Sequence, residues 1–348
     1  MMNFQDYVDT VKSRIKEYLP EEYAGAEVNV HETRKLNETY TALSVRKEDQ
    51  VIASSINLDA FFQNYDGSLA QLNRDMERIA ELAQTQPGNL NMDVLTDYNE
   101  AKNHLFIRVS SLEQNKDLVD KVPHMIKEDL LITYHIVAEL EEDGMASSMV
   151  NNQMMETYQV TEQQLHNDAL ESSKNILPAS ISTMFDAVKP MIMEEMMESG
   201  MTRDEAEMAA NQMSDETENP MMIVTNDRTV NGAGVIFYPN VMETISERLG
   251  SDFFILPSSV HETIVLPDNG AYTFEDLKEM VQDVNSTQVM PEDKLTDEVY
   301  HFDSKEHVFE KAETFAERQK AKEKAADQNL DANKELVKPK RRAAEMAM

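Results

Sequence analysis

The stretch from Pro220 to Gly270 constrains the fold of this chain more than any other part of the sequence. Short apolar runs bounded by turn residues are typical of buried strands, and they occur here at 221–225, 235–238, 253–256 and 263–266. Between the second and third runs, Val241, Ile245 and Leu249 recur four residues apart, which is the stripe of a short helix, and a glycine follows where a C-terminal cap belongs. The stretch therefore predicts strand, turn, strand, helix, strand, loop and strand.

The first part of the chain is predicted to combine helices with an antiparallel meander. Apolar residues recur at helical spacing over 4–19, and Pro20 ends that helix because proline lacks a backbone N–H. Three apolar runs predict the strands, centred on Val28 and Val30, on Leu43 and Val45, and on Val51, Ile52 and Ile56. A longer helix is predicted over 68–84. The turn signal Pro87-Gly88-Asn89 follows it and marks the end of a first domain.

Strands and helices alternate in the predictions for the middle of the chain. Apolar runs predict strands at 105–109 and 130–140. Thr161 and Gln164 have the spacing of a capping box, which opens a helix that ends near Ile176.

The segment 184–213 is rich in methionine and is predicted to be a helical insertion. Pro190 suits the first turn of a helix, and Gly200 suits the position after its end. Thr202 and Glu205 then form a capping box for a second helix. The insertion is therefore predicted to be a helix, a glycine turn and another helix.

The methionines of the insertion allow two interpretations. Met191 and Met193 could coordinate a soft ion such as Cu(I), because thioethers are soft ligands. The other interpretation is flexible apolar filler, or an adaptable apolar face for a protein partner. We favour the second interpretation because the insertion contains neither cysteine nor histidine.

Beyond a helix predicted over 273–284, the sequence becomes polar and charged. From Lys311 onward it holds ten basic and seven acidic residues and lacks a strong apolar stripe. We therefore expect a solvated helix followed by a disordered end. His301 and His307 lie among acidic residues just before this segment, where a mixed histidine and carboxylate metal site is an alternative to ordinary surface positions.

Charge and cysteine content exclude several classes of function. The chain carries 65 acidic and 32 basic residues, for a net charge of −33, so its body is not expected to bind DNA directly. The absence of cysteine excludes disulfides, thiolate metal sites and cysteine nucleophiles. No apolar run approaches the roughly 18 residues of a membrane span, and the N-terminus mixes acids with bases, unlike a signal peptide. These features predict a cytoplasmic protein without a cofactor.

A candidate catalytic site lies in the loop PSSVHE, with Ser258, Ser259, His261 and Glu262. A zinc-protease motif would require a second histidine at position 265, which is Val265. A serine, histidine and glutamate hydrolytic site is an alternative, although neighbours in one loop rarely converge as nucleophile, base and orienting acid. We favour a structural loop whose side chains bond to the backbone between two strands.

Several segments of the chain resemble one known family. They are the run MIVTNDRTVNGAGVIFYPNVMETISERLGSDFFILPSSVHETIVLP and the earlier pieces SINLDAFFQNYDGSLAQL, VPHMIKEDLLITYHIVAEL and LHNDALESSKNILP. Together they resemble a family of uncharacterised bacterial proteins, domain of unknown function 5688, from residue 4 to about 300. The resemblance implies a protein of gut anaerobes that is often encoded near mobile elements or phage genes. It implies no catalytic residues, but it makes the PSSVHE loop a feature of the family.

The sequence therefore predicts an α+β protein. We divide it into an N-terminal subdomain at 1–88, a core at 89–300 with the helical insertion at 184–213, and a charged tail at 301–348. The favoured function is that of a non-enzymatic cytoplasmic protein in a mobile-element or phage context that acts through a protein partner. One alternative is a hydrolase or metal-dependent enzyme centred on PSSVHE, and a second is an acidic DNA mimic. The oligomeric state is left open.

Overall fold

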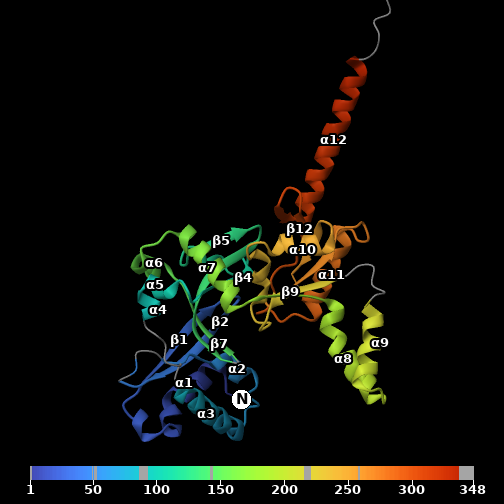
Figure 1. Ribbon diagram of the computed structural model, residues 1–348. Coiled ribbons are helices and arrows are strands. Elements are labelled where there is room, and N and C mark those ends of the chain that lie inside the picture. The colour runs from blue at the N-terminus through green and yellow to red at the C-terminus, as the bar shows by residue number, and fades with distance from the viewer. Residues whose placement is uncertain are drawn as a thin grey trace, which may run out of the picture.

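The computed structural model describes residues 2–48, 50, 53–85, 93–141, 144–214, 221–257 and 259–336 (Figure 1). It confirms the α+β class, because helices are combined with three antiparallel sheets. The turn at Pro87-Gly88-Asn89, the run Val51-Ile52, Ser258 and the end of the tail lie outside the described residues. None of the described helices is long and apolar enough to cross a membrane.

An N-terminal unit is built from a three-stranded sheet and its covering helices. Its elements are α1 (Phe4–Arg14), η1 (Ile15–Tyr18), η2 (Glu21–Tyr23), β1 (Glu27–Lys35), β2 (Glu38–Arg46), β3 (Ile56–Asn57), α2 (Leu58–Gln63) and α3 (Leu69–Gln84). The Ser68 hydroxyl caps α3, and the helix buries Leu72, Met76 and Ile79. Leu69, at the start of the helix, is 74% exposed. The Tyr7 hydroxyl donates to Asp75 at 2.8 Å and so joins α1 to α3.

The second unit is a four-stranded sheet with helices along one side. Its elements are α4 (Asp93–Thr96), α5 (Tyr98–Ala101), β4 (Leu105–Ser111), η3 (Lys116–Leu118), β5 (His124–Lys127), β6 (Leu130–Glu141), β7 (Gly144–Met149), α6 (Asn152–Tyr158) and α7 (Glu162–Ile176). Strand β6 pairs with β4 along one side and with β5 and β7 along the other. The predicted strands at 105–109 and 130–140 and the helix from Thr161 are confirmed. The Ile107 N–H donates to the Ser173 hydroxyl at 3.0 Å, which fixes α7 against the edge of β4.

The third unit is a six-stranded sheet in the order β13-β12-β10-β11-β9-β8. Its strands are β8 (Ala179–Thr183), β9 (Met222–Asn226), β10 (Phe253–Leu256), β11 (Thr263–Pro267), β12 (Tyr300–Asp303) and β13 (Val308–Lys311), and its helices are α10 (Val241–Leu249), α11 (Phe274–Thr287) and α12 (Ala312–Leu336). Side chains alternate between the two faces of β10. Phe253 and Ile255 join the core shared with the four-stranded sheet and α10, whereas Phe254 and Leu256 pack under α11.

One predicted strand is wrong. Residues 235–238 belong to η4 (Gly232–Phe237) and its end, not to a strand. Asn231 and Asn240 flank the segment with φ of 55° and 66°, and these left-handed conformations turn the chain on both sides. Residues 232–236 of η4 are buried, and a Cβ on Gly234 would lie 3.5 Å from Ile107 of β4. The run is apolar because this compact helical turn is buried, and a short buried turn has the same apolar pattern as a short buried strand.

Strands β5, β8, β12 and β13 were not predicted from the sequence. Strand β12 is buried at every position, yet it includes His301 and Asp303, which conceal its apolar character. Residues 301–311, which were placed with the charged tail, thus belong to the sheet, while the division of the chain as a whole stays a prediction. The start of α12 is also not simply solvated, because Ala312 is buried and the Phe315 ring stacks on His301 at 3.6 Å.

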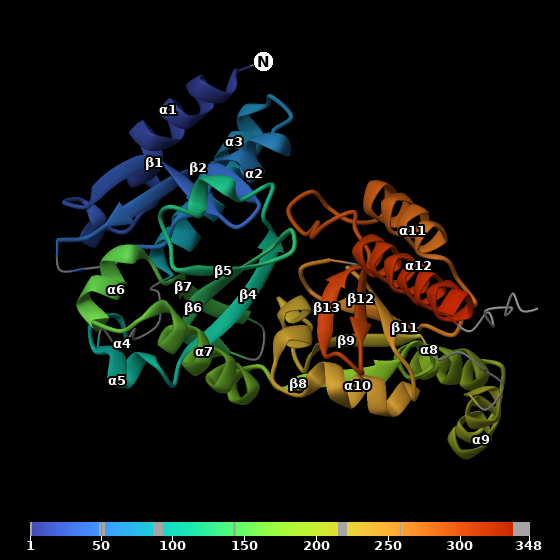
Figure 2. The ribbon, with the colours of Figure 1, turned by 90° about the horizontal axis from the view of Figure 1, so that it is seen from above.

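The predicted helix, glycine turn and second helix are confirmed as α8 (Met184–Glu198) and α9 (Arg203–Ser214), with Gly200 at a φ of 104°. Pro190, however, lies inside α8 and not in its first turn. Thr183 and Asp186 form a capping box that starts the helix earlier, so the proline occupies an interior position at the cost of one helical hydrogen bond. The two helices project away from the β8 edge of the sheet (Figures 1 and 2).

Candidate functional site

The PSSVHE loop connects β10 to β11, and its histidine is held by two distant segments. The Asn231 N–H donates to His261 Nδ1 at 3.2 Å, and His261 Nε2 lies 3.1 Å from an Asp293 carboxylate oxygen. The His261 N–H donates to the Ser259 hydroxyl at 3.0 Å. The polar groups of the loop are therefore used to join segments that are far apart in the sequence.

Backbone contacts close the same loop further. The Val260 N–H donates to the Asp293 carbonyl at 2.8 Å, and the Val260 carbonyl accepts from Ala233 at 3.1 Å. The Thr225 hydroxyl donates to the His261 carbonyl at 2.7 Å. Gly232 packs so closely here that a Cβ would lie 2.1 Å from the Thr225 hydroxyl oxygen and 2.4 Å from the His261 carbonyl oxygen.

Among the three candidate residues that the structure describes, Ser259, His261 and Glu262, no side chain bonds to the side chain of another. Ser258 lies outside the described residues, and Ser259 is 8% exposed with its hydroxyl on a backbone amide. His261 faces Asp293 and not Glu262, whose side chain makes no hydrogen bond with a described residue. Within the described part of the chain, no group of three or more His, Asp or Glu side chains is placed to hold a metal ion, including the surroundings of His301 and His307.

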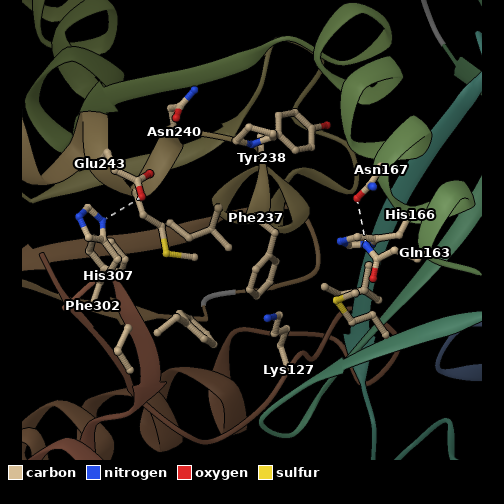
Figure 3. A pocket seen from close by; sticks show the side chains of 17 residues that line it. Lys127, Gln163, His166, Asn167, Phe237, Tyr238, Asn240, Glu243, Phe302 and His307 are labelled. Carbon is tan, nitrogen blue, oxygen red and sulfur yellow. Dashed lines mark hydrogen bonds and ion pairs between the residues drawn. The ribbon is translucent and has the colours of Figure 1, made fainter.

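A cleft of about 600 Å³ lies between the second and third units (Figure 3). One wall comes from β5 and α7, and the other from η4, α10 and the turn between β12 and β13. This cleft was missed by sequence analysis because its walls come from four separate parts of the chain.

Polar side chains gather on the α7 wall of the cleft. Gln163 Nε2 donates to Asn167 Oδ1 at 3.0 Å, and the Asn167 amide group donates to no residue that the structure describes. His166 Nδ1 lies 3.1 Å from the Tyr134 hydroxyl, and its ring faces the cavity (Figure 3). Burial, assisted by the charge of Lys127, lowers the pKa of His166, so this histidine is neutral at pH 7.

Aromatic and charged side chains form the opposite wall. The rings of Phe237 and Phe309 meet edge to face at 5.2 Å. Beside them, His307 Nδ1 lies 3.3 Å from a Glu243 carboxylate oxygen, and Figure 3 shows this pair at the end of the cavity away from α7. The cleft thus has a polar end, an apolar middle and a paired acid and base at its far end.

A second candidate is the methionine hairpin, which we define as α8, α9 and their turn (residues 184–214). Large apolar side chains are exposed along it, at Val188, Met191, Met197, Met201, Met208 and Met213. No residue of α8 is buried, whereas Ala206 and Ala210 of α9 are fully buried. Met191 and Met193 lie two positions apart on a helix and so do not face each other, which does not favour a shared copper ion.

Comparison with known proteins gives one match. No curated protein and no solved structure matches the chain. A family model described as a family of unknown function, DUF5688, matches residues 4–304. The match covers most of the chain, including the loop, the methionine hairpin and most of the cleft, whose residues His307, Val308 and Phe309 lie beyond it. This protein therefore belongs to the DUF5688 family.

Proposed function

We propose that this protein is a non-enzymatic binding protein that acts through a protein partner docked on the methionine hairpin. The observation that carries the proposal is the exposure of long apolar side chains on a projecting pair of helices, with Met191 at 70% and Met208 at 67%. Contiguous exposed apolar surface is typical of interaction sites. Methionine is suited to such a surface because its flexible, polarisable side chain adapts to a partner.

Charge on the hairpin indicates the chemistry of the partner. Residues 184–214 include seven acidic and only two basic residues. An apolar surface bordered by carboxylates complements a helix with one apolar face and flanking lysines or arginines. We therefore propose a basic amphipathic helix as the docked segment.

The wider setting of the proposal is the cytoplasm, in a mobile-element or phage context. A chain without cysteine has no need of an oxidising compartment. The net charge of −33 supports a partner other than DNA for the body of the protein.

A model peptide tests the hairpin directly. Fluorescence anisotropy would compare a labelled amphipathic peptide of leucine and lysine with a peptide in which every lysine is glutamate. We expect the basic peptide to bind the wild-type chain and to lose about tenfold in affinity, or about 1.4 kcal/mol, in a Met191→Gln and Met208→Gln variant.

The matched control replaces Met280 and Met290 with glutamine, since both are exposed outside the hairpin, at 42% and 60%. Binding should be unchanged in this control. Equal affinity in the two double variants, or equal binding of the acidic peptide, would contradict the proposal.

A further inference from the structure

We infer that the cleft between α7 and α10 binds a small organic anion with a flat apolar body. This site is separate from the methionine hairpin and does not depend on it. The volume of the cleft, about 600 Å³, lies in the range of small-molecule sites, roughly 300–1,000 Å³.

Lys127 provides the charge for such an anion. Its ammonium group makes no hydrogen bond or ion pair with any described residue, and Figure 3 shows it directed into the cavity. Several lysines elsewhere in the chain form ion pairs, as Lys278 does with Glu298 at 2.7 Å. In a chain with a net charge of −33, an unpaired lysine inside a cleft is a local centre for an anion.

Two neutral groups line the same cleft as Lys127 and can complete the anion site. The Asn167 amide group makes no hydrogen bond with a described residue, because Gln163 uses only the carbonyl oxygen of that side chain. His166 is fixed at Nδ1 by the Tyr134 hydroxyl, so its Nε2 remains for a ligand. When the tyrosine donates to Nδ1, Nε2 carries the proton of the neutral ring and is a donor. An ammonium, an amide and an imidazole would then converge on one charged head group.

The middle of the cleft selects the body of the ligand. Phe237, Phe309 and Met242 line it, and Phe309 is itself stacked on Tyr300 at 4.9 Å between ring centres. The faces and edges of these rings present flat apolar surface, which suits a flat ring system better than a branched or strongly hydrated body.

The far end of the cleft orients the ligand. The Glu243 carboxylate lies at this end, 3.3 Å from His307 Nδ1, and its negative charge would repel a second anionic group. The head group is therefore expected at Lys127, and the apolar body points toward α10.

Isothermal titration calorimetry with three naphthalene probes tests this inference. The probes are 2-naphthyl phosphate, 2-naphthoate and 2-naphthol, which share one ring system and differ in the head group. We expect saturable binding of at least one of the two anions, with 2-naphthol clearly weaker. The tighter of the two anions distinguishes a phosphate from a carboxylate as the natural head group.

Variants of the intact chain locate the binding. Lys127→Met keeps the side-chain length and removes the charge, and Asn167→Asp keeps the shape and adds a negative charge. Each should weaken binding of the anion by about tenfold or more, the scale of a lost charge-assisted contact. The matched control is Lys12→Met on α1, an exposed lysine in the N-terminal unit, which should bind as the wild type does. Circular dichroism would check that each variant is folded.

Three results would overturn the inference. They are no saturable binding of either anion to the wild-type chain, unchanged affinity in folded Lys127→Met, and binding of 2-naphthol as tight as that of the anions.

Discussion

The PSSVHE loop and the cleft both contain a histidine beside a carboxylate, but they use these groups differently. In the loop, His261 bonds to Asn231 and Asp293 and is 34% exposed, and the backbone of the loop bonds to Ala233, Asp293 and Thr225. In the cleft, His307 is 64% exposed and bonds only to Glu243 among the described residues, while Lys127 has no partner there. Residue type is thus a poor guide to a binding site, and hydrogen-bonding capacity left unused is a better one.

The largest effect is expected from filling the space behind the loop. Gly232→Ala would place a Cβ 2.4 Å from the His261 carbonyl oxygen, and backbone must move to relieve that contact. We expect a loss of about 3 kcal/mol or more in the free energy of unfolding, the upper range for overpacking. Denaturant unfolding would measure it. The control is Gly234→Ala, where the nearest atom lies at an ordinary 3.5 Å, and a similar loss there would contradict the closed loop.

Helix α12 shows a similar contrast, because its first residues contact the sheet and its later residues project away from it (Figure 1). Ending the chain after Lys311 removes the Phe315 ring from His301 and Arg318 from Asp303, which it contacts at 3.0 Å. Because apolar and charged contacts are lost together, we expect the free energy of unfolding to fall by about 2–4 kcal/mol. A chain that ends after Lys324 keeps these contacts and should match the wild type. Equal stability of the two truncated chains would show that the start of α12 is dispensable, as expected of the solvated helix that the sequence predicts.

A single side chain of the loop should have a smaller effect. His261→Ala removes two hydrogen bonds and leaves the Asn231 N–H without its acceptor, so we expect a loss of about 1–2 kcal/mol in thermal or denaturant unfolding. Glu262→Gln should change stability by less than about 0.5 kcal/mol, because that carboxylate bonds to no described residue. An unchanged melting temperature in both variants would contradict a structural role for the loop.

The smallest effect is expected from the pH dependence of the cleft. The pKa of His166 is lowered in the folded chain, so folding favours its neutral form. The stability from this group is complete above the unfolded pKa of about 6.5 and is lost as the pH falls below that value. Between pH 7 and 5.5, His166→Gln should therefore lose less stability than the wild type, by at most about 1 kcal/mol. Identical pH profiles in urea unfolding would show that His166 is not held neutral.

Much of the fold could be predicted because its apolar periodicity is local. Strands β9, β10 and β11, helix α10 and the methionine hairpin were all found from runs or stripes within a few residues. Strand β12 was not predicted because its polar residues have partners that are distant in the sequence. His301 bonds to Asp268 at 3.1 Å, and Asp303 bonds to Arg318. Such pairings allow polar residues to occupy a buried strand, and they cannot be predicted from the residues next to them in the sequence.

The cleft could not be predicted from the sequence for the same reason. Lys127, His166, Glu243 and His307 meet only after two sheets have packed together. The PSSVHE loop was visible because its chemical groups are neighbours in the sequence, which says nothing about whether their bonds are already used.

Histidine-selective NMR of the intact chain tests most directly the claim that the loop is structural and the cleft binds ligand. The chain has eight histidines, and single His→Asn or His→Gln variants would assign the signals of His166, His307 and His261. On titration with the tighter of the two naphthyl anions, we expect the signals of His166 and His307 to shift with one common saturation curve. The His261 signal should stay in place. A shift of His261 with His166 and His307 unchanged would place the ligand at the loop and contradict the account.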